Sequence, residues 1–360
     1  MSKDGSTYSP VCKTATKACE KGEFPISVIG LDHGHINGMV QNMLEAGATL
    51  DMVWDKDPEK MKNFKASFPK VMMAKAEEDV YASKESMMIL SSIIPNERWK
   101  VGLKALSHGK HYMSDKTGFT ELDKLEKARS AVAESGLKWS ICFSERLQVE
   151  SAVLAGQLIE EGEIGDVIQI MNIAPHRLAP ETRPDWFFNK EQYGGILCDI
   201  GSHQFEQMLF YTKSKTAEIV HSQVGNYKHP DYPELEDFGD CTLLLESGAT
   251  GYTRLDWFTP EGLGTWGDGR LFILGTKGYI ELRKYINVGV SSDGDNLYLV
   301  NGTRQEMINA AGKTGFPYFA QLIRDCLDGT DLALPQEHVF EVSRIAIEAE
   351  QKAKVLKGFQ

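Results

Sequence analysis

An aspartate and a histidine four positions apart are the first residues here whose types and spacing suit catalysis. Asp199 and His203 lie in the stretch GGILCDIGSH (194–203), which opens an apolar-periodic helix. On a helix, the i, i+4 spacing places both side chains on one face. A carboxylate beside an imidazole fixes its tautomer and raises its basicity, which suits a general base near neutral pH. The alternative interpretation is an exposed helical ion pair.

A lysine supplies the second candidate. Lys116 follows the run Met113-Ser114-Asp115, which ends a predicted strand. Ligands bind at the carboxyl edge of a parallel sheet, so this position favours a functional lysine over an ordinary surface one.

A third candidate site begins where the apolar run 25–30 ends in Gly30 and a helix follows. This arrangement offers free backbone N–H groups to an anion, as in dinucleotide pyrophosphate sites. The sequence GLDHGH (30–35) keeps only the first glycine of G-x-G-x-x-G, and Gly34 and Gly38 are alternative points of close backbone approach. A carboxylate at Asp32 repels a pyrophosphate unless it caps the helix and points away. The predicted cofactor contacts in this turn are Gly30, Asp32, His33, Gly34 and His35.

An acidic residue about 20 positions further on tests the dinucleotide interpretation, because it would hold the adenosine ribose hydroxyls. Asp55 stands 21 positions after Gly34, at the end of the run Met52-Val53-Trp54. A carboxylate there repels a 2′-phosphate, so NAD is favoured over NADP. The alternative is a simple turn aspartate.

The segment Asp32, His33 and His35 also resembles the first metal ligands of a barrel hydrolase, since imidazoles suit zinc and similar ions. The chain, however, ends in antiparallel hairpins rather than eight βα units. We therefore predict no metal site and keep the metal-dependent hydrolase or lyase as an alternative.

The elements that position these residues alternate in the first part of the chain. Apolar strand-like runs at 25–30, 49–55, 86–94, 110–114 and 139–143 are separated by helical patterns at 35–46, 58–68, 97–107 and 121–135. This rhythm predicts βαβ units and a doubly wound parallel sheet.

The rhythm changes near residue 145. A helix at 149–161 and a strand at 166–173 precede a strand-rich stretch, 217–300, with hairpin turn signals, and helices follow at 317–326 and 338–356. We predict an N-terminal tail or arm (1–23), a dinucleotide-binding domain (24–145) and a second α/β domain (146–360).

Composition excludes several classes of protein. The 360 residues carry a net charge of −12 with 42% hydrophobic residues, which argues against a nucleic-acid binder. No apolar run is long enough to span a membrane, and residues 1–23 lack the apolar core of a secretory signal. Six scattered cysteines indicate a reducing compartment, so a cytoplasmic location is expected.

Several stretches together resemble the glucose–fructose oxidoreductase / inositol dehydrogenase / rhizopine catabolism (Gfo/Idh/MocA) family. The resemblance runs from about residue 25 to 215. It rests on Pro95-Asn96, ALSHGKH (105–111), Asp115-Lys116-Thr117 for the family's E-K-P, IGDV (164–167), and the G-G-x-x-x-D-x-x-x-H pattern of 194–203.

The resemblance implies an N-terminal NAD(P)-binding Rossmann domain and a C-terminal α/β domain with a large, mostly antiparallel open sheet that commonly forms the oligomer interface. It implies catalytic roles for Lys116, Asp199 and His203, with Asn96 and Lys116 also at the cofactor. The broken glycine fingerprint and the missing proline after Lys116 depart from the family pattern.

The expected function is NAD-dependent oxidation of a secondary hydroxyl of a sugar, cyclitol or glycoside, with C3 of a glucoside as one candidate position. His203 is the expected base and Asp199 its orienting partner, with Lys116 as base an alternative. The predicted substrate contacts are Arg146, His176 and Trp186. Arg146 could instead pair with Glu145, and Trp186 could serve packing.

Three further expectations remain open at this level. The protein is expected to be a homo-oligomer, with residues 1–23 either a tail or an arm around a neighbouring subunit. A tightly held NAD, recycled by reduction of a second sugar, is one hypothesis. A non-catalytic sugar or dinucleotide sensor on the same fold is an alternative that would explain the altered glycine motif.

Overall fold

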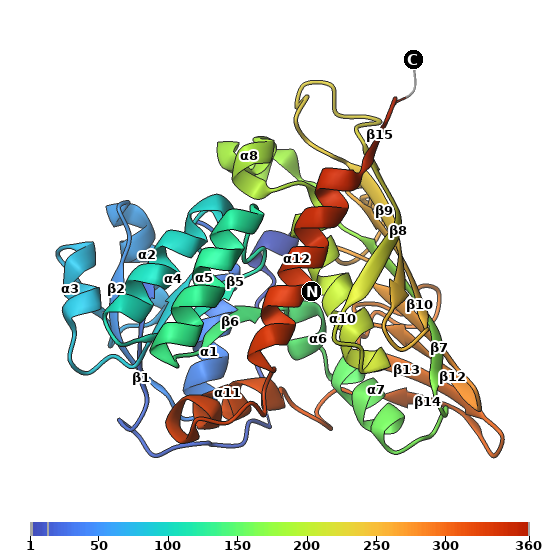
Figure 1. Cartoon of the computed structure of the whole chain (residues 1–360), viewed down its shortest axis with the longest axis horizontal. Coiled ribbons are helices and arrows are strands. Elements are labelled where there is room, and N and C mark those ends of the chain that lie inside the picture. The colour runs from blue at the N-terminus through green and yellow to red at the C-terminus, as the bar shows by residue number, and fades with distance from the viewer. Residues whose placement is uncertain (1–2, 13, 359–360) are drawn as a thin grey trace. The chain divides into compact units, whose positions relative to one another are not determined.

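The computed structural model describes residues 3–12 and 14–358, which form two compact units (Figure 1). The first, called here the parallel-sheet unit, comprises residues 6–12, 14–142 and 316–340. The second, the large-sheet unit, comprises residues 3–5, 143–315 and 341–358. Each unit is described by itself.

A six-stranded parallel sheet forms the centre of the parallel-sheet unit. Its strands are β1 (Pro25–Ile29), β2 (Thr49–Trp54), β3 (Met72–Met73), β4 (Met88–Ser91), β5 (His111–Asp115) and β6 (Trp139–Cys142). They pair in the order β3-β2-β1-β4-β5-β6, all parallel. This is the strand order of dinucleotide-binding doubly wound sheets, so the predicted fold class is confirmed.

The helices of this unit are α1 (His35–Glu45), α2 (Pro58–Ser67), α3 (Glu77–Ala82), α4 (Arg98–Ser107), α5 (Leu122–Ser135) and α11 (Pro317–Asp328), with a 3₁₀ turn at Pro95–Glu97. Local signals set several ends. The Asp57 side chain accepts from two amides at the start of α2, and Gly136, at φ +67°, ends α5. The sequence did not predict β3 and α3, because a two-residue exposed strand leaves no periodic pattern.

The final part of the chain returns to complete this unit. Tyr318 on α11 shares a hydrogen bond of 2.6 Å with the Ser140 hydroxyl. The Gln336 side chain accepts from the Trp139 amide and donates to the Trp139 carbonyl, at 2.9 and 2.8 Å. Residues 316–340 therefore buttress β6 although they lie far from it in sequence.

The N-terminal segment lies along α1 of its own chain. The buried amide of Asn42 donates to the Pro10 carbonyl and accepts from the Cys12 amide, at 2.8 and 2.9 Å. At the start of the helix, a Cβ on residue 34 would lie 2.5 Å from the Ser6 carbonyl oxygen, so only glycine fits beneath the segment. Residues 6–12 are thus an ordered arm packed on the first helix of the sheet.

A nine-stranded mixed sheet forms the large-sheet unit. Its strands are β7 (Val167–Pro175), β8 (Ala217–Gly225), β9 (Phe238–Leu245), β10 (Thr250–Asp256), β11 (Arg270–Gly275), β12 (Gly278–Arg283), β13 (Asn296–Asn301), β14 (Gln305–Asn309) and β15 (Lys354–Leu356). The order is β14-β13-β12-β11-β7-β10-β9-β8-β15. Only the β7–β10 and β8–β15 pairs are parallel, so the predicted, mostly antiparallel open sheet is confirmed.

Helices cover one face of this sheet and leave the other open (Figure 1). They are α6 (Ser144–Leu147), α7 (Glu150–Glu160), α8 (Lys190–Tyr193), α9 (Ile196–Asp199), α10 (Gly201–Thr212) and α12 (Gln336–Lys352) from residue 341 onward, with 3₁₀ turns at Pro180–Thr182 and Asp185–Phe188. The 3₁₀ turn Gly5–Thr7 and α12 each include residues of both units. α9 and α10 pack on β9 and β10, whereas α7 packs on β12 and β13. The single helix expected to carry Asp199 and His203 is divided at Ile200 into α9 and α10.

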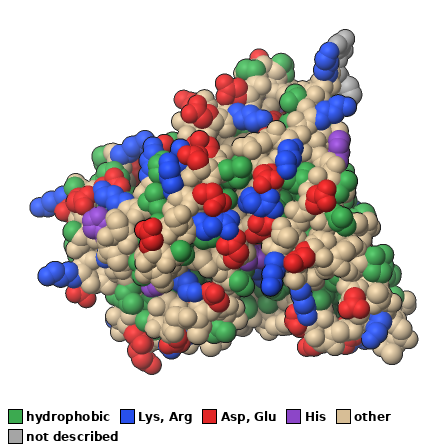
Figure 2. All heavy atoms as spheres, in the orientation of Figure 1, with side chains coloured by type: hydrophobic (Ala, Val, Ile, Leu, Met, Phe, Trp, Pro, Cys, Tyr) green, Lys and Arg blue, Asp and Glu red, His purple; other side chains and the backbone are tan. Residues whose placement is uncertain are grey.

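The distribution of charged side chains and the state of the cysteines are as expected from the composition. Figure 2 shows acidic and basic side chains interspersed over the visible face rather than gathered in one patch. All six cysteines are free, and five of them are buried. None of the helices in the described part of the chain combines the length and apolar character needed to cross a lipid bilayer.

Candidate functional site

The turn after β1 requires glycine at position 30. Gly30 has φ +82°, and a Cβ there would lie 2.7 Å from Cβ of Ile93. Its amide donates to the Trp54 carbonyl at 3.0 Å, which ties β1 to the end of β2. Gly34 is the N-cap residue of α1 and has no side chain that could accept from the amides of the first helical turn. These amides lie at the carboxyl edge of the sheet, where they can donate to a ligand.

Asp55 and Asp32 lie beside this turn, each with a partner. The buried Asp55 carboxylate accepts from the Leu31 amide at 2.6 Å and from the Asp57 amide at 2.8 Å. Each of its oxygens keeps a second lone pair for a ligand hydroxyl. Asp32 forms an ion pair with Lys60, so the negative charge that seemed unfavourable for a pyrophosphate is balanced.

A buried carboxylate joins the two histidines of the turn. Asp115, at the end of β5, lies 2.7 Å from Nδ1 of His33 and 3.2 Å from Nδ1 of His35. It also accepts from the Lys116 amide at 2.8 Å. Burial, followed by the charge of His35, lowers the pKa of His33 to about 4. Although burial would raise the pKa of Asp115, the charges of His35 and His33 hold it well below its usual value.

Arg98 is a site residue that the sequence analysis missed. Its Nε donates to the Ile93 carbonyl at 2.8 Å, and Nη1 donates to the carbonyls of Asp115 and Thr117 at 3.0 and 2.7 Å. The guanidinium is 1% exposed and holds the ends of β4 and β5 in register. An arginine inside a helical run carries no spacing signal that would have identified it.

His33, His35 and Asp115 also offer ligand atoms within 4.8 Å of one another, which is compatible with a metal ion. The metal-dependent alternative also used Asp32 as a ligand, but the Asp32 carboxylate forms an ion pair with Lys60. The buried Arg98 guanidinium lies 3.6 Å from the Asp115 carboxylate, and a divalent cation would have to share that carboxylate with it. We therefore interpret the group as a hydrogen-bonded cluster.

Asn96 fits a polar ligand. Its Oδ1 atom is buried and has no hydrogen-bond partner among the residues that the structure describes. It stands on the 3₁₀ turn directly after β4, at the carboxyl edge where a dinucleotide binds in this sheet order. Together with the Gly30 turn, this acceptor without a partner indicates that the residues present suit a dinucleotide cofactor.

The three predicted catalytic residues belong to different units. Lys116 follows β5 in the parallel-sheet unit and is 8% exposed. Asp199 ends α9 and His203 lies in the first turn of α10, both buried in the large-sheet unit. The charge of Asp199 acts on Arg183, whose pKa is lowered mainly by burial.

Two buried carboxylates hold the start of α9. Glu236 accepts from the Ile196 amide at 2.8 Å, and Glu350 accepts from the Leu197 amide at 3.2 Å. Lys190 forms ion pairs with both. Gly195 has φ +90°, and a Cβ there would lie 2.2 Å from the Glu350 carboxyl carbon. Burial, followed by repulsion from Glu236, raises the pKa of Glu350 to about 8.

The predicted substrate residues have distinct environments. Arg146 pairs with Glu206 through Nε at 2.8 and 2.9 Å and stacks on Phe210 at 3.6 Å, so its guanidinium already links α6 to α10. The His176 ring lies 4.6 Å from that of Trp266. The indole Nε1 of Trp186 is buried with no hydrogen-bond partner within the described ranges, which suits a ligand hydroxyl.

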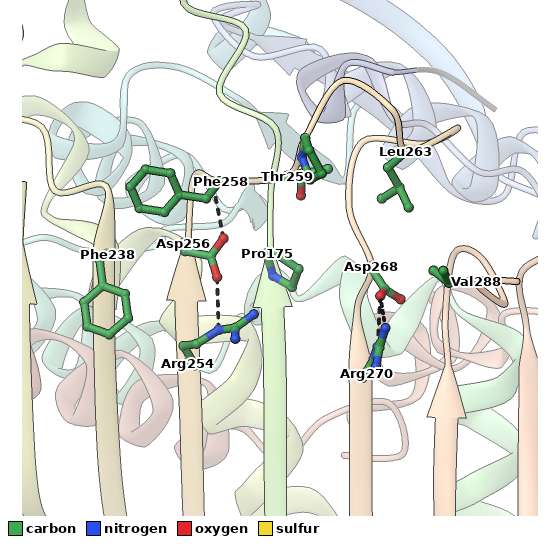
Figure 3. Close-up of a pocket in the computed structure, with 11 residues that line it drawn as sticks. Pro175, Phe238, Arg254, Asp256, Phe258, Thr259, Leu263, Asp268, Arg270 and Val288 are labelled. Carbon is green, nitrogen blue, oxygen red and sulfur yellow. Dashed lines mark hydrogen bonds and ion pairs between the residues drawn. The ribbon is translucent and has the colours of Figure 1, made fainter. Parts of the chain in front are cut away.

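A separate pocket of about 490 Å³ lies in the large-sheet unit at the ends of β7, β10 and β11 (Figure 3). Two ion pairs line it, Arg254 with Asp256 at 3.1 Å and Arg270 with Asp268. It contains none of the predicted site residues.

Comparisons with known proteins agree with this architecture. Residues 153–281 match the family model described as the GFO/IDH/MocA C-terminal domain. An oxidoreductase structure from Erwinia carotovora atroseptica SCRI1043, with no substrate in its name, is 44% identical, with a TM-score of 0.90, over 93% of this chain and 100% of that one.

More distant relatives carry more specific names. Scyllo-inositol 2-dehydrogenase (NADP(+)) IolW of Bacillus subtilis (strain 168) is 26% identical over 151 residues, which are 41% of each protein. The chain therefore spans about two fifths of that curated relative's length. A levoglucosan dehydrogenase in complex with NADH and levoglucosan is 15% identical with a TM-score of 0.76, over 91% of this chain and 97% of that one, which shows a shared fold.

Glu350 predicts how stability depends on pH. Its pKa in the folded protein, about 8, lies above the ordinary 4.5, so the folded state keeps a proton that the unfolded chain releases. The free energy of unfolding should therefore fall as pH rises between these values. Glu350→Gln keeps an acceptor for the Leu197 amide and removes the titration. We expect the variant to be more stable than wild type by on the order of 1–3 kcal/mol at about pH 9.

Thermal unfolding followed by circular dichroism across this pH range provides the measurement. Glu348→Gln is the matched control, because Glu348 lies on the same helix but its pKa is lowered. Parallel curves of melting temperature against pH for wild type and Glu350→Gln would contradict the prediction.

Proposed function

Because the chain belongs to the Gfo/Idh/MocA family, we propose that it is an NAD-dependent oxidoreductase that oxidises a secondary hydroxyl of a sugar, glycoside or cyclitol. The observation that carries this proposal is the β3-β2-β1-β4-β5-β6 parallel sheet with its Gly30 turn. The NADH-bound levoglucosan dehydrogenase of the same fold and the NADP-dependent inositol dehydrogenase support it.

The cofactor would accept the hydride at its nicotinamide ring. The chain's own residues bind and orient it: the amides of the 30–35 turn face the pyrophosphate, and Asp55 accepts from ribose hydroxyls. Asn96 Oδ1 takes a donor of the cofactor. Because Asp115 is hydrogen-bonded to Nδ1 of both His33 and His35, the two imidazole rings have fixed orientations beside the cofactor turn.

His203 accepts the proton of the substrate hydroxyl, Asp199 orients it, and the positive charge of Lys116 stabilises the developing alkoxide. The alternative within this proposal is that Lys116, rather than His203, accepts the proton of the substrate hydroxyl. Trp186 and His176 contact the substrate, and Arg146 holds α10 in place through Glu206. C3 of a glucoside is the hydroxyl that we propose to test first.

We also propose that the open face of the large sheet joins two copies of the chain. One transverse row crosses seven neighbouring strands on this face, formed by Thr242, Tyr252, Met171, Phe272, Glu281, Tyr298 and Met307. Met171, on the central strand β7, is 38% exposed, and Met307, on the edge strand β14, is 51% exposed, so the row presents apolar side chains to solvent. The six free cysteines support a reducing, cytoplasmic location.

Single substitutions test the catalytic assignment. We expect His203→Ala and Lys116→Ala each to lower the rate of NADH formation by about 10²–10⁴-fold, because a positioned proton-transfer group contributes that much. Reduction of NAD is followed by absorbance with levoglucosan, scyllo-inositol, aldoses and glucosides as substrates.

Bound cofactor is measured in parallel, after acid denaturation of the purified protein, together with metals. If both variants stay within about threefold of wild type, the catalytic assignment fails. Bound dinucleotide without turnover of any substrate would favour the sensor, and stoichiometric metal would favour the hydrolase or lyase.

Asp55 predicts the choice of cofactor. We expect kcat/KM with NAD to exceed that with NADP by at least about tenfold, because the carboxylate repels a 2′-phosphate. Asp55→Ser should lower this ratio, and Asp57→Ser, which changes a neighbouring helix cap, is the control. A wild-type preference for NADP would overturn the assignment.

The oligomer proposal predicts a change in mass. Met171→Glu and Phe272→Glu place charges in the transverse row, and we expect each to halve the mass measured by light scattering. Leu332→Glu, at a position 62% exposed outside the row, should leave the mass unchanged. A monomeric wild-type protein would refute the proposed interface.

A further inference from the structure

A buried carboxylate of the large-sheet unit has no part in the mechanism above. Glu145 lies on α6 and is 3% exposed. Nζ of Lys284, which directly follows β12 and is also 3% exposed, donates to Glu145 Oε2 at 3.2 Å. The same Nζ donates to Gln207 Oε1 on α10 at 2.8 Å. The pair is therefore enclosed and hydrogen-bonded rather than solvated.

Four elements of the unit meet at this carboxylate. His176, directly after β7, places Nε2 3.7 Å from Glu145 Oε1. α10 contributes His203, whose charge acts on Glu145. It also contributes Gln207, whose Nε2 donates to the His203 carbonyl at 2.8 Å while its Oε1 accepts from Lys284. β7 and β12 run in the same direction, so both supply residues from their carboxyl ends. Glu145 is thus shared between the proposed base and a predicted substrate residue.

Stability alone does not account for such a pair. Removing two charges from water costs several kcal/mol per ion, and apolar side chains of similar volume are often equally or more stable. A negative charge beside an imidazole, in contrast, favours the protonated ring and makes it a better proton acceptor.

We propose that Glu145 is a positioning residue that raises the basicity of His203, and that Lys284 holds this carboxylate in place and limits its effect. The inference rests on the proposed function, because it takes His203 as the proton acceptor. Glu145 itself does not exchange the proton, and the His203 imidazole is the group that titrates.

The charges around the cluster agree with this division of roles. Although burial would raise the pKa of Glu145, the charge of Lys284, followed by those of His203 and His176, lowers it to about 2. Glu145 is therefore ionised throughout the working range. The charged or titratable groups that act on Glu145 are Lys284, His203 and His176. Glu206, which is paired with Arg146, acts on Lys284.

Two substitutions should move the His203 pKa in opposite directions. Glu145→Gln removes the negative charge and keeps an acceptor for Lys284, so we expect the His203 pKa to fall by about one unit. Lys284→Met leaves Glu145 without its fixed positive partner, so we expect the pKa to rise. The pKa is read from the imidazole Cε1–H signal in NMR titrations of the full-length protein, and His203→Gln assigns that signal.

Kinetics supply the second readout. With levoglucosan, scyllo-inositol or the aldose that is oxidised fastest, the acid limb of log kcat/KM should shift in the same direction as the NMR pKa in each variant. Glu145→Asp retains the charge and should restore most of the shift. Asp240→Asn is the matched control, since this buried carboxylate of the same unit contacts Gln223, 2.8 Å away, and should move neither readout.

The outcomes separate the two proposals. If His203→Ala retains hydride transfer, the proposed function fails in its choice of base. If His203→Ala is inactive but Glu145→Gln and Lys284→Met leave the His203 pKa unchanged, or shift it in the same direction, the proposed function stands and the role of Glu145 is wrong. Circular dichroism confirms that each variant is folded. If Glu145→Gln does not fold, Glu145→Asp and Lys284→Met decide the question.

Discussion

One buried carboxylate organises the carboxyl edge of the parallel sheet. Asp115 accepts from His33, His35 and the Lys116 amide, and Arg98 braces the backbone around it. Because a buried charge must be surrounded by donors, these partners fix the β1–α1 turn relative to the end of β5. The imidazoles and the lysine are thereby held at the edge where a dinucleotide binds in this fold. The turn thus combines two required glycines, Gly30 and Gly34, with side-chain hydrogen bonds from His33 and His35.

The large-sheet unit uses buried carboxylates in the same way. Glu236 and Glu350 hold the start of α9, and Glu145 lies under α10 with Lys284. Asp199 and His203 therefore stand on two helices, the four-residue α9, whose first amides donate to buried carboxyl groups, and the longer α10, rather than on one continuous helix.

The sequence predicted what periodicity and strand ends encode. Apolar runs identified the parallel sheet, and the positions of Gly30, Asp55 and Lys116 followed from where strands end. Partners distant in sequence leave no such pattern, so the contacts of Arg98 with Asp115, of Arg146 with Glu206 and of Glu145 with Lys284 could not be predicted. The division of the helix at Ile200 was missed because its residues keep helical spacing across the break.

The return of residues 316–340 to the parallel-sheet unit bears on how the protein is made. α11 and the start of α12 buttress β6, yet they are synthesised only after eight of the nine strands of the large sheet, β7 to β14. The six-stranded sheet therefore remains incompletely packed while residues 143–315, which separate the two segments of the parallel-sheet unit, are synthesised. The apolar side chains of β6 therefore stay without these partners while residues 143–315 are synthesised, and exposed apolar surface of this kind is what chaperones bind.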